Sequence, residues 1–242
     1  LILVHGHAIS IGEAANFLNE YKQKGTFKEF SIFQKQLYLD NLYKNKNVIL
    51  PSQDIEVCEN KNWDKKASIR TTYYIDENGK FSDNQKIETY AERLAEVVDV
   101  LKKCTNSDKV NLIGHSMGGL VIREYAKNYP ENVNKIITIG TPNQGMPNQY
   151  ILGIKYFCDK FRYENDIECK QIEIGSKFLL NLNNETKNIN YYTISGILES
   201  GGVLGLACIN YGSCNDGIVC TKLAKIENAK NYIVYSENPS SK

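Results

Sequence analysis

Short apolar runs alternate with amphipathic stretches along most of this chain. Runs of apolar residues predict buried strands at residues 1–4, 109–113, 133–140, 191–195 and 232–235. Alternation in a Thr- and Tyr-rich stretch predicts one further strand at residues 69–75. Apolar residues at helical spacing predict helices over residues 10–24, 27–43, 85–104 and 118–129. Residues 44–68 are polar with few periodic signals, and we expect a long loop there.

Strands that alternate with helices are typical of parallel βαβ units, which predicts an α/β fold. The length of 242 residues and the hydrophobic content of 42% suit one large domain and leave no room for two. We therefore interpret residues 1–242 as a single domain. Residues 143–188 interrupt the alternation with an aromatic-rich amphipathic segment. This segment predicts a lid or cap insertion, with ordinary packing of the fold as the alternative.

Charge and hydropathy exclude several classes of partner. The net charge is +1, from 29 basic and 28 acidic residues, so no basic field is available to hold nucleic acid. The sequence contains no run of about 18 apolar residues that could span a bilayer.

The two ends of the sequence lie within predicted elements. Residues 1–4 read as the middle of a strand and residues 236–242 as part of a loop. We therefore expect the natural polypeptide to extend beyond both ends.

Seven cysteines are many for a cytosolic enzyme of this size. Cys158 lies close to Cys169 in sequence, and Cys208 lies close to Cys214, with Cys220 just beyond. Such spacing in irregular sequence predicts disulfides, Cys158–Cys169 among them, and an extracellular or periplasmic location. The alternative, reduced and buried thiols in a cytoplasmic protein, stays open. No C-x-x-C pair is present, so we expect neither a zinc site nor any other metal or cofactor.

The motif most directly tied to chemistry is G-x-S-x-G at residues 114–118. It follows a predicted strand and precedes a predicted helix, which is the context that a nucleophile elbow requires. A serine in that sharp turn presents its hydroxyl to a substrate, and the helix directs its first N–H groups at a developing oxyanion. We therefore predict Ser116 as the nucleophile and the backbone N–H of Met117 as one oxyanion donor.

A second oxyanion donor is expected in the loop that follows the first strand. We assign it to the backbone N–H of His7, with Ala8 as the alternative. The neighbouring His5 could titrate, but the general base comes last in the chain of this kind of enzyme. We interpret His5 as a residue that orders the oxyanion loop by a hydrogen bond.

The acid that orients the base should follow Ser116 along the chain. Asp216 lies in an Asp-Gly turn that leads into an apolar run, and a carboxylate held by turn amides stays ionised. We favour Asp216 over Glu199, which follows the strand at residues 191–195. No histidine follows Asp216, so we expect the catalytic histidine beyond Lys242, within about ten residues.

With these residues in place, the chain resembles the lipase branch of the α/β-hydrolase superfamily. That branch contains the bacterial triacylglycerol lipases and the inositol-deacylase-like esterases. The matching stretches are residues 4–6, 109–125 with GHSMGGLVIREY, 136–145 with IITIGTPNQG, 175–179 and 215–219. The resemblance implies a mostly parallel sheet flanked by helices, Ser116 and Asp216 as nucleophile and acid, and His7 and Met117 as oxyanion donors.

The predicted function is the hydrolysis of carboxylic esters through a serine acyl-enzyme. The expected substrates are small-molecule or lipid esters, and an enzyme of this kind would also contact a lipid interface. An acyl thioesterase or acyltransferase would use the same site, because the sequence does not separate leaving groups. A third hypothesis is a binding protein that has the hydrolase fold without turnover.

Overall fold

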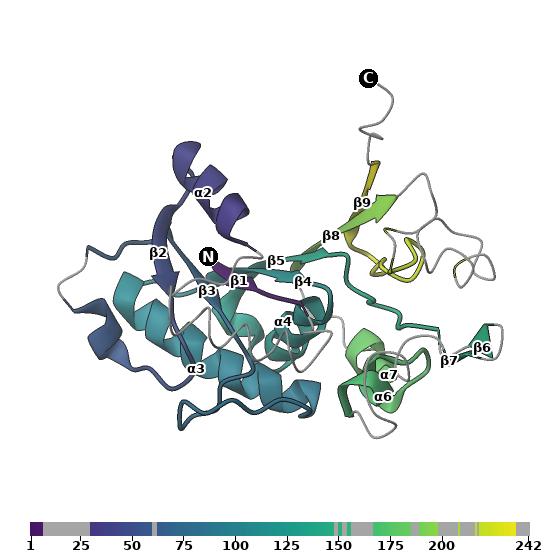
Figure 1. Ribbon diagram of the computed structural model, residues 1–242. Coiled ribbons are helices and arrows are strands. Elements are labelled where there is room, and N and C mark those ends of the chain that lie inside the picture. The colour runs from purple at the N-terminus through teal and green to yellow at the C-terminus, as the bar shows by residue number, and fades with distance from the viewer. Residues whose placement is uncertain are drawn as a thin grey trace.

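A seven-stranded sheet, parallel throughout, forms the centre of the molecule (Figure 1). The computed structural model describes residues 1–6, 30–59, 62–147, 150–151, 154–155, 167–184, 189–197, 208, 216 and 218–235. The strands are β1 (Ile2–Val4), β2 (Lys44–Val48), β3 (Ala67–Thr71), β4 (Val110–His115), β5 (Val133–Ile139), β8 (Asn190–Ile197) and β9 (Lys230–Tyr235). Their spatial order is β2-β3-β1-β4-β5-β8-β9. Two further short strands, β6 (Tyr150–Ile151) and β7 (Ile154–Lys155), pair separately and antiparallel.

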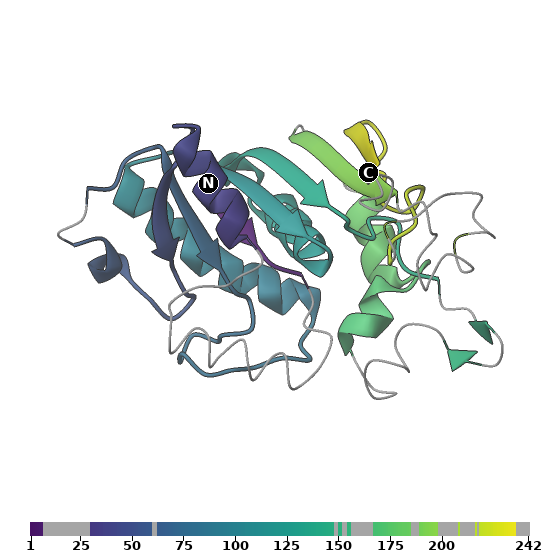
Figure 2. The same ribbon diagram turned by 45° about the horizontal axis from the view of Figure 1, so that its top comes forward.

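Helices cover both faces of the sheet (Figure 1). The longer ones are α2 (Ser31–Leu39), α3 (Ile87–Thr105), α4 (Met117–Asn128) and α7 (Lys177–Asn184), and the shorter ones are η1 (Ile55–Cys58), η2 (Pro130–Asn132) and α6 (Ile167–Ile172). α3 and α4 lie on one face and α2 on the other, while α6 and α7 lie together near the β8 end (Figures 1 and 2). This arrangement confirms the predicted α/β fold.

The core lies between the sheet and the pair α3–α4. Ile2 and Val4 of the buried strand β1 belong to this cluster, and the apolar stripe of α3 contributes Leu94, Val97 and Leu101 to it. Every residue of α4 from Met117 to Ala126 is buried. Burial of a large aliphatic side chain stabilises a fold by about 1.5–3 kcal/mol, so this layer holds the start of α4 firmly in place.

The strand order creates a switch point at β1. After β1 the chain builds β2 and β3 on one side, and then crosses to the other side to build β4. β1 and β4 are neighbours in register, with Val4 opposite Gly114. Ligands of open α/β sheets bind beyond the carboxyl ends of the strands at such a point, which marks the region beyond Val4 and His115.

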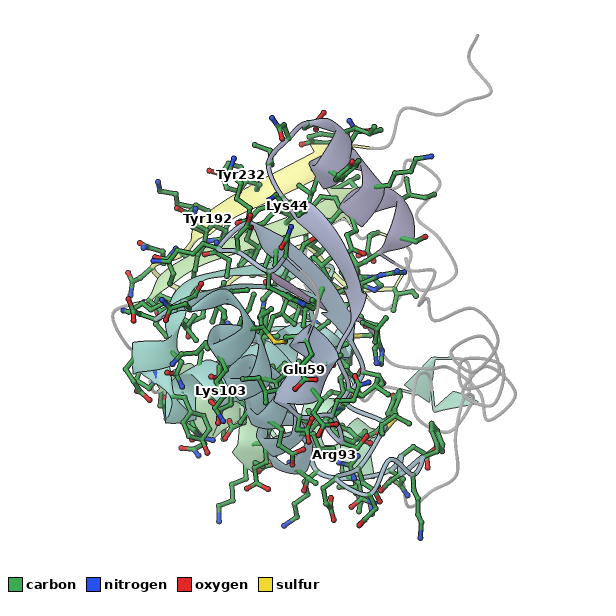
Figure 3. The ribbon with its side chains drawn as sticks, turned by 90° about the vertical axis from the view of Figure 1, so that its left-hand side faces the viewer. Lys44, Glu59, Arg93, Lys103, Tyr192 and Tyr232 are labelled. Atoms are coloured by element: carbon green, nitrogen blue, oxygen red, sulfur yellow. A yellow bond between two sulfur atoms is a disulfide. The ribbon has the colours of Figure 1, made fainter. Side chains whose placement is uncertain are left out.

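The edge of the sheet that β9 forms is exposed to solvent. All six residues of β9 are solvent-exposed, and they include the apolar side chains of Tyr232, Ile233, Val234 and Tyr235. Tyr192 of β8 and Tyr232 of β9 both lie at this edge, as Figure 3 shows.

Several predicted boundaries are wrong. The expected loop at residues 44–68 contains the edge strand β2 and the 3-10 helix η1. The predicted helix over residues 27–43 is represented by the shorter α2, and the predicted strand at 69–75 begins and ends earlier, as β3. The insertion expected at residues 143–188 stays a prediction; within it, the structure describes α6 and α7 among other elements. The predicted helix over residues 10–24 lies outside the described residues.

The structure contains disulfides, as predicted, but the bonded pairs differ from those that the sequence spacing favoured. Cys58 of η1 is bonded to Cys104 near the end of α3, and Cys208 is bonded to Cys220. Sequence spacing had grouped Cys208 first with Cys214, and it had not suggested the Cys58–Cys104 bond. Cys169 is disulfide-bonded as well, whereas Cys158, its predicted partner, lies outside the described residues.

Candidate active site

Ser116 occupies the sharp turn between β4 and α4. Its backbone has φ 48° and ψ −128°, a conformation that non-glycine residues rarely adopt. The turn is crowded: a Cβ placed at Gly114 would lie 2.6 Å from the carbonyl oxygen of Gly118, and one placed at Gly118 would lie 2.1 Å from that of His5. Only glycine fits at both positions, which explains the two glycines of the motif.

The end of β1 lies directly beside this turn. A Cβ placed at Gly6 would lie 3.0 Å from the Cβ of Ser116. On its other side, the Ser116 N–H donates to the carbonyl oxygen of Ile139 at the end of β5, at 2.9 Å. Ser116 is therefore fixed between the ends of two strands, and it remains half-buried.

Met117 begins α4, so its N–H belongs to the first helical turn, whose N–H groups have no acceptor within the helix. The positive end of the helix dipole lies at the same place. His7 and Ala8, the two residues considered for the second donor, lie outside the described residues.

His5 is buried and fully engaged. Its Nδ1 lies 2.5 Å from the carbonyl oxygen of Gly6, and its Nε2 lies 2.9 Å from the Thr72 hydroxyl. Because a carbonyl only accepts, Nδ1 is the donor of the first of these hydrogen bonds. The imidazole also stacks on Tyr73, with ring centroids 4.4 Å apart. These contacts fit the interpretation that His5 orders the loop rather than transferring protons.

Asp216 lies at the carboxyl ends of β5 and β8. Its Oδ1 accepts from the N–H groups of Ile218 and Val219, at 3.0 and 2.7 Å. A Cβ placed at Gly140 would lie 3.0 Å from Asp216 Oδ2, and one placed at Gly196 would lie 3.0 Å from Asp216 Cβ. One carboxylate oxygen is thus held by turn amides, and the other is directed toward the end of β5. Glu199, the other predicted acid, lies outside the described residues.

The His115 ring lies between the β1 end and the Asp216 side of the site. A Cβ placed at Gly6 would lie 2.9 Å from His115 Nδ1, and one placed at Gly140 would lie 3.8 Å from its Nε2. The structure therefore brings Gly6, the adjacent residues His115 and Ser116, and Asp216 together at the carboxyl ends of the strands, although these three segments are far apart in the sequence.

A buried polar network ties the loop after Asp216 to the helix after Ser116. Asn143 is fully buried, and its Nδ2 donates to the carbonyl oxygen of Ala224 at 2.6 Å and to the Thr138 hydroxyl at 3.2 Å. Its Oδ1 accepts from Arg123 of α4 at 3.1 Å, and Arg123 also donates to Asn183 of α7 at 2.7 Å. Sequence reasoning missed these residues, because a buried Asn gives no periodic signal.

Burial lowers the pKa of Arg123 to about 10. The side chain remains charged at neutral pH, with neutral amide oxygens as its hydrogen-bond partners in the network. A buried charge of this kind is costly unless its acceptors stay in place, so Arg123 makes the position of Asn143 critical.

The described residues show no group of three or more His, Cys, Asp or Glu side chains placed to hold a metal ion. A hollow of about 440 Å³ lies between the start of α3 and the pair α6–α7, and it is lined by neither Ser116 nor Asp216. In the part of the chain that the structure describes, no helix is long and apolar enough to cross a membrane.

Comparison with known proteins agrees with the observed fold. Residues 66–164, which include the elbow, match the family model described as the alpha/beta hydrolase fold. The mature lipase BlEst2 of Bacillus licheniformis superposes with a TM-score of 0.51 at 22% identity, over 66% of this chain and 73% of that one. The chain has the α/β-hydrolase fold. A metagenomic carboxyl esterase, MGS0156, superposes on this hydrolase fold with a TM-score of 0.50 at 15% identity, over 73% of this chain and 59% of that one.

Two curated relatives of this α/β-hydrolase-fold chain are more similar over a short stretch. Triacylglycerol lipases of Pseudarthrobacter phenanthrenivorans and Burkholderia plantarii are each 46% identical to it over 54 residues. That stretch is 22% of this chain, and it spans only 17% and 15% of the two lipases. The predicted resemblance to lipases and esterases of this superfamily is confirmed.

Proposed function

We propose that this protein hydrolyses carboxylic esters through an acyl-enzyme formed on Ser116. The observation that supports this most strongly is the Ser116 backbone, held at φ 48° directly before a buried helix. Strain of this kind persists only where the surrounding structure enforces it, and Ser116 lies beside the switch point of the sheet.

In the proposed reaction, Ser116 Oγ attacks the carbonyl carbon of the ester while a histidine base accepts its proton. The carbonyl oxygen becomes an oxyanion, which the N–H groups of Met117 and His7 would stabilise. The protonated base then gives its proton to the departing alcohol, and water hydrolyses the acyl-enzyme by the same steps. Asp216 would orient the histidine and stabilise its charged form.

The proposed substrates are small-molecule or lipid esters, in line with the lipases that share the matched stretch. The disulfides at Cys58–Cys104 and Cys208–Cys220 favour an oxidising compartment, so we propose that the protein works outside the cytoplasm. We also propose that residues 1–242 form one domain, in which the lid or cap insertion at residues 143–188 contacts the acyl chain of the substrate.

Hydrolysis of paired p-nitrophenyl butyrate and butyryl thioester substrates tests this proposal. The natural full-length protein should hydrolyse the oxygen ester. Ser116→Ala should lower that activity by several orders of magnitude and leave the melting temperature unchanged. Faster turnover of the thioester would favour the thioesterase alternative. Activity that survives Ser116→Ala would refute the assignment, and a folded protein without activity would favour a binding function.

A further inference from the structure

Asp216 lies where β8 extends past its neighbour β5. The last residue pair of these two strands is Ile139 with Ile194, and β8 continues to Ile197. Gly140 follows β5 directly, and its N–H donates to the carbonyl oxygen of Ile194 at 2.9 Å. Because a Cβ at Gly140 would lie 3.0 Å from Asp216 Oδ2, the carboxylate lies next to the end of β5.

Gly196 of β8 borders the acid on a second side. Side chains alternate along a strand, so Gly196 shares a face of β8 with Tyr192 and Ile194. A Cβ at Gly196 would lie 3.0 Å from Asp216 Cβ and 3.8 Å from Asp216 Cα. Non-bonded carbon atoms pack best at about 3.5–4.0 Å, so the missing side chain of Gly196 makes room for the acid.

The backbone of β8 gives no other reason for a glycine at this position. Gly196 is paired in register with Val234 of β9, and its φ lies outside the left-handed region. A glycine inside a strand weakens that strand, because it loses more conformational freedom on folding and offers no side chain to pack. Gly140 differs, since its φ of 53° favours glycine whatever lies nearby.

Asp216 is held where it would meet a new methyl group on Gly196. Its Oδ1 accepts from the N–H groups of Ile218 and Val219, and its own N–H donates to the Val219 carbonyl oxygen at 3.4 Å. A Cβ at Gly196 would therefore displace Asp216 by about a few tenths of an ångström against these hydrogen bonds. Small displacements of a catalytic group lower the rate of a reaction without changing the chemistry.

We propose that Gly196 is a positioning residue for the candidate acid. The side chain that it lacks sets where the Asp216 carboxylate lies, and thereby how that carboxylate faces the histidine base. This inference rests on the proposed function. Gly196 touches neither the substrate nor the reacting atoms, and it acts only through Asp216.

The test is Gly196→Ala in the full-length protein, combined with Asp216→Asn in a double-mutant cycle. Because alanine suits a strand better than glycine, the melting temperature of Gly196→Ala should stay unchanged or rise. With a short-chain ester, kcat should fall about five- to tenfold at unchanged KM. In the Asp216→Asn background the same methyl group should change kcat by less than about twofold, because the charge whose position matters is already gone.

Gly79→Ala is the control for a loss of stability alone. Gly79 lies in the turn that begins at Asp76, has a φ of 72°, and contacts no part of the candidate site. Alanine is strained at such a φ, so the melting temperature of this variant should fall. Its kcat should stay within about twofold of the wild-type value, measured well below the melting temperature.

Three results would overturn the inference. The first is wild-type kcat in Gly196→Ala, and the second is an equal loss of kcat with and without Asp216→Asn, because the methyl group would then act on something other than the acid. The third is a fall in melting temperature as large as that of Gly79→Ala, since the methyl group would then disturb the fold.

These results are distinct from failure of the proposed function. If Ser116→Ala retains activity, the proposed function itself fails. If Ser116→Ala and Asp216→Asn lose activity but Gly196→Ala does not, only the inference about Gly196 fails.

Discussion

The segment that holds Ser116 and the segment that holds Asp216 are built in different ways. The first is continuous in sequence: β4 runs into the turn, the turn into α4, and α4 is buried from Met117 to Ala126. The second segment, which holds Asp216, has no helix or strand among the described residues of 216–226. They are held from a distance, by Asn143 and Gln144 through the carbonyl oxygens of residues 223–225 and by the disulfide to Cys208.

This contrast shows two ways of placing a candidate catalytic residue. Ser116 is placed by backbone geometry, so its position depends on a few neighbouring residues and on two glycines. Asp216 is placed by side-chain contacts that cross about 80 residues of sequence, as in the hydrogen bond from Asn143 to Ala224 with a separation of 81. Changes to the distant anchors should therefore disturb the acid and spare the serine.

The largest expected effect on the acid side comes from Asp216→Asn. The amide keeps an oxygen for the N–H groups of Ile218 and Val219 but removes the charge that supports the base. We expect kcat to fall by about 10³- to 10⁴-fold, measured with a short-chain ester.

Asp76→Asn is the matched control, because Asp76 also accepts turn amides, those of Asn78 and Lys80, and has no part in the site. Its activity should be unchanged. A loss smaller than tenfold in Asp216→Asn, combined with a large loss in Glu199→Gln, would move the acid to Glu199.

A smaller loss is expected from Asn143→Ala, which removes the link between the acid loop and Arg123. An unsatisfied buried partner costs about 1–3 kcal/mol of stability, so the melting temperature should fall. Well below that temperature, kcat should still drop about tenfold, because the loop loses its anchor.

The control for Asn143→Ala is Asn111→Ala, which deletes hydrogen bonds to Tyr43 and Asn134 at the other end of β4. It should leave kcat unchanged. If Asn143→Ala loses stability but retains full kcat, then the network stabilises the fold without positioning Asp216.

The smallest effect on activity is expected from removing the disulfides. The disulfide whose loss costs more stability should not be the one whose loss lowers kcat. Loop entropy assigns about 4 kcal/mol to Cys58–Cys104, with a separation of 46, and about 3 kcal/mol to Cys208–Cys220, with a separation of 12. Replacing Cys58 and Cys104 by alanine should therefore lower the melting temperature more.

Only the replacement of Cys208 and Cys220 should lower kcat, by a few-fold, because Cys220 lies four residues from Asp216. Thermal melts and initial rates on the two double variants check both statements. Equal kcat in the two variants would argue that the acid loop does not need its disulfide.

The same contrast explains what could be predicted from the sequence. β4, α3, α4 and β5 were predicted within a few residues, because each has either a continuous apolar run or a strong helical period. Ser116 and Met117 followed from the elbow motif, which is local. Asp216 could be ranked only by its order in the chain and its turn sequence.

The remaining features depend on contacts between distant segments. β2 is short and polar, and it forms because β3 offers a free edge; η1 contains one half of the disulfide to Cys104. α6 is attached to the start of α3 by Gln171 and by the buried Glu168, which accepts from Asn84 N–H at 3.0 Å. No periodicity in residues 143–188 indicates such attachments, since they depend on single polar side chains.

The most direct test of the central claim is covalent labelling of the full-length protein with a fluorophosphonate probe, followed by mass spectrometry of the tryptic peptides. An activated serine attacks such a probe, whereas an ordinary hydroxyl does not. We expect one label, on Ser116, which is absent in Ser116→Ala and forms more slowly in Asp216→Asn. A folded protein that takes no label, or a label that persists in Ser116→Ala, would contradict it.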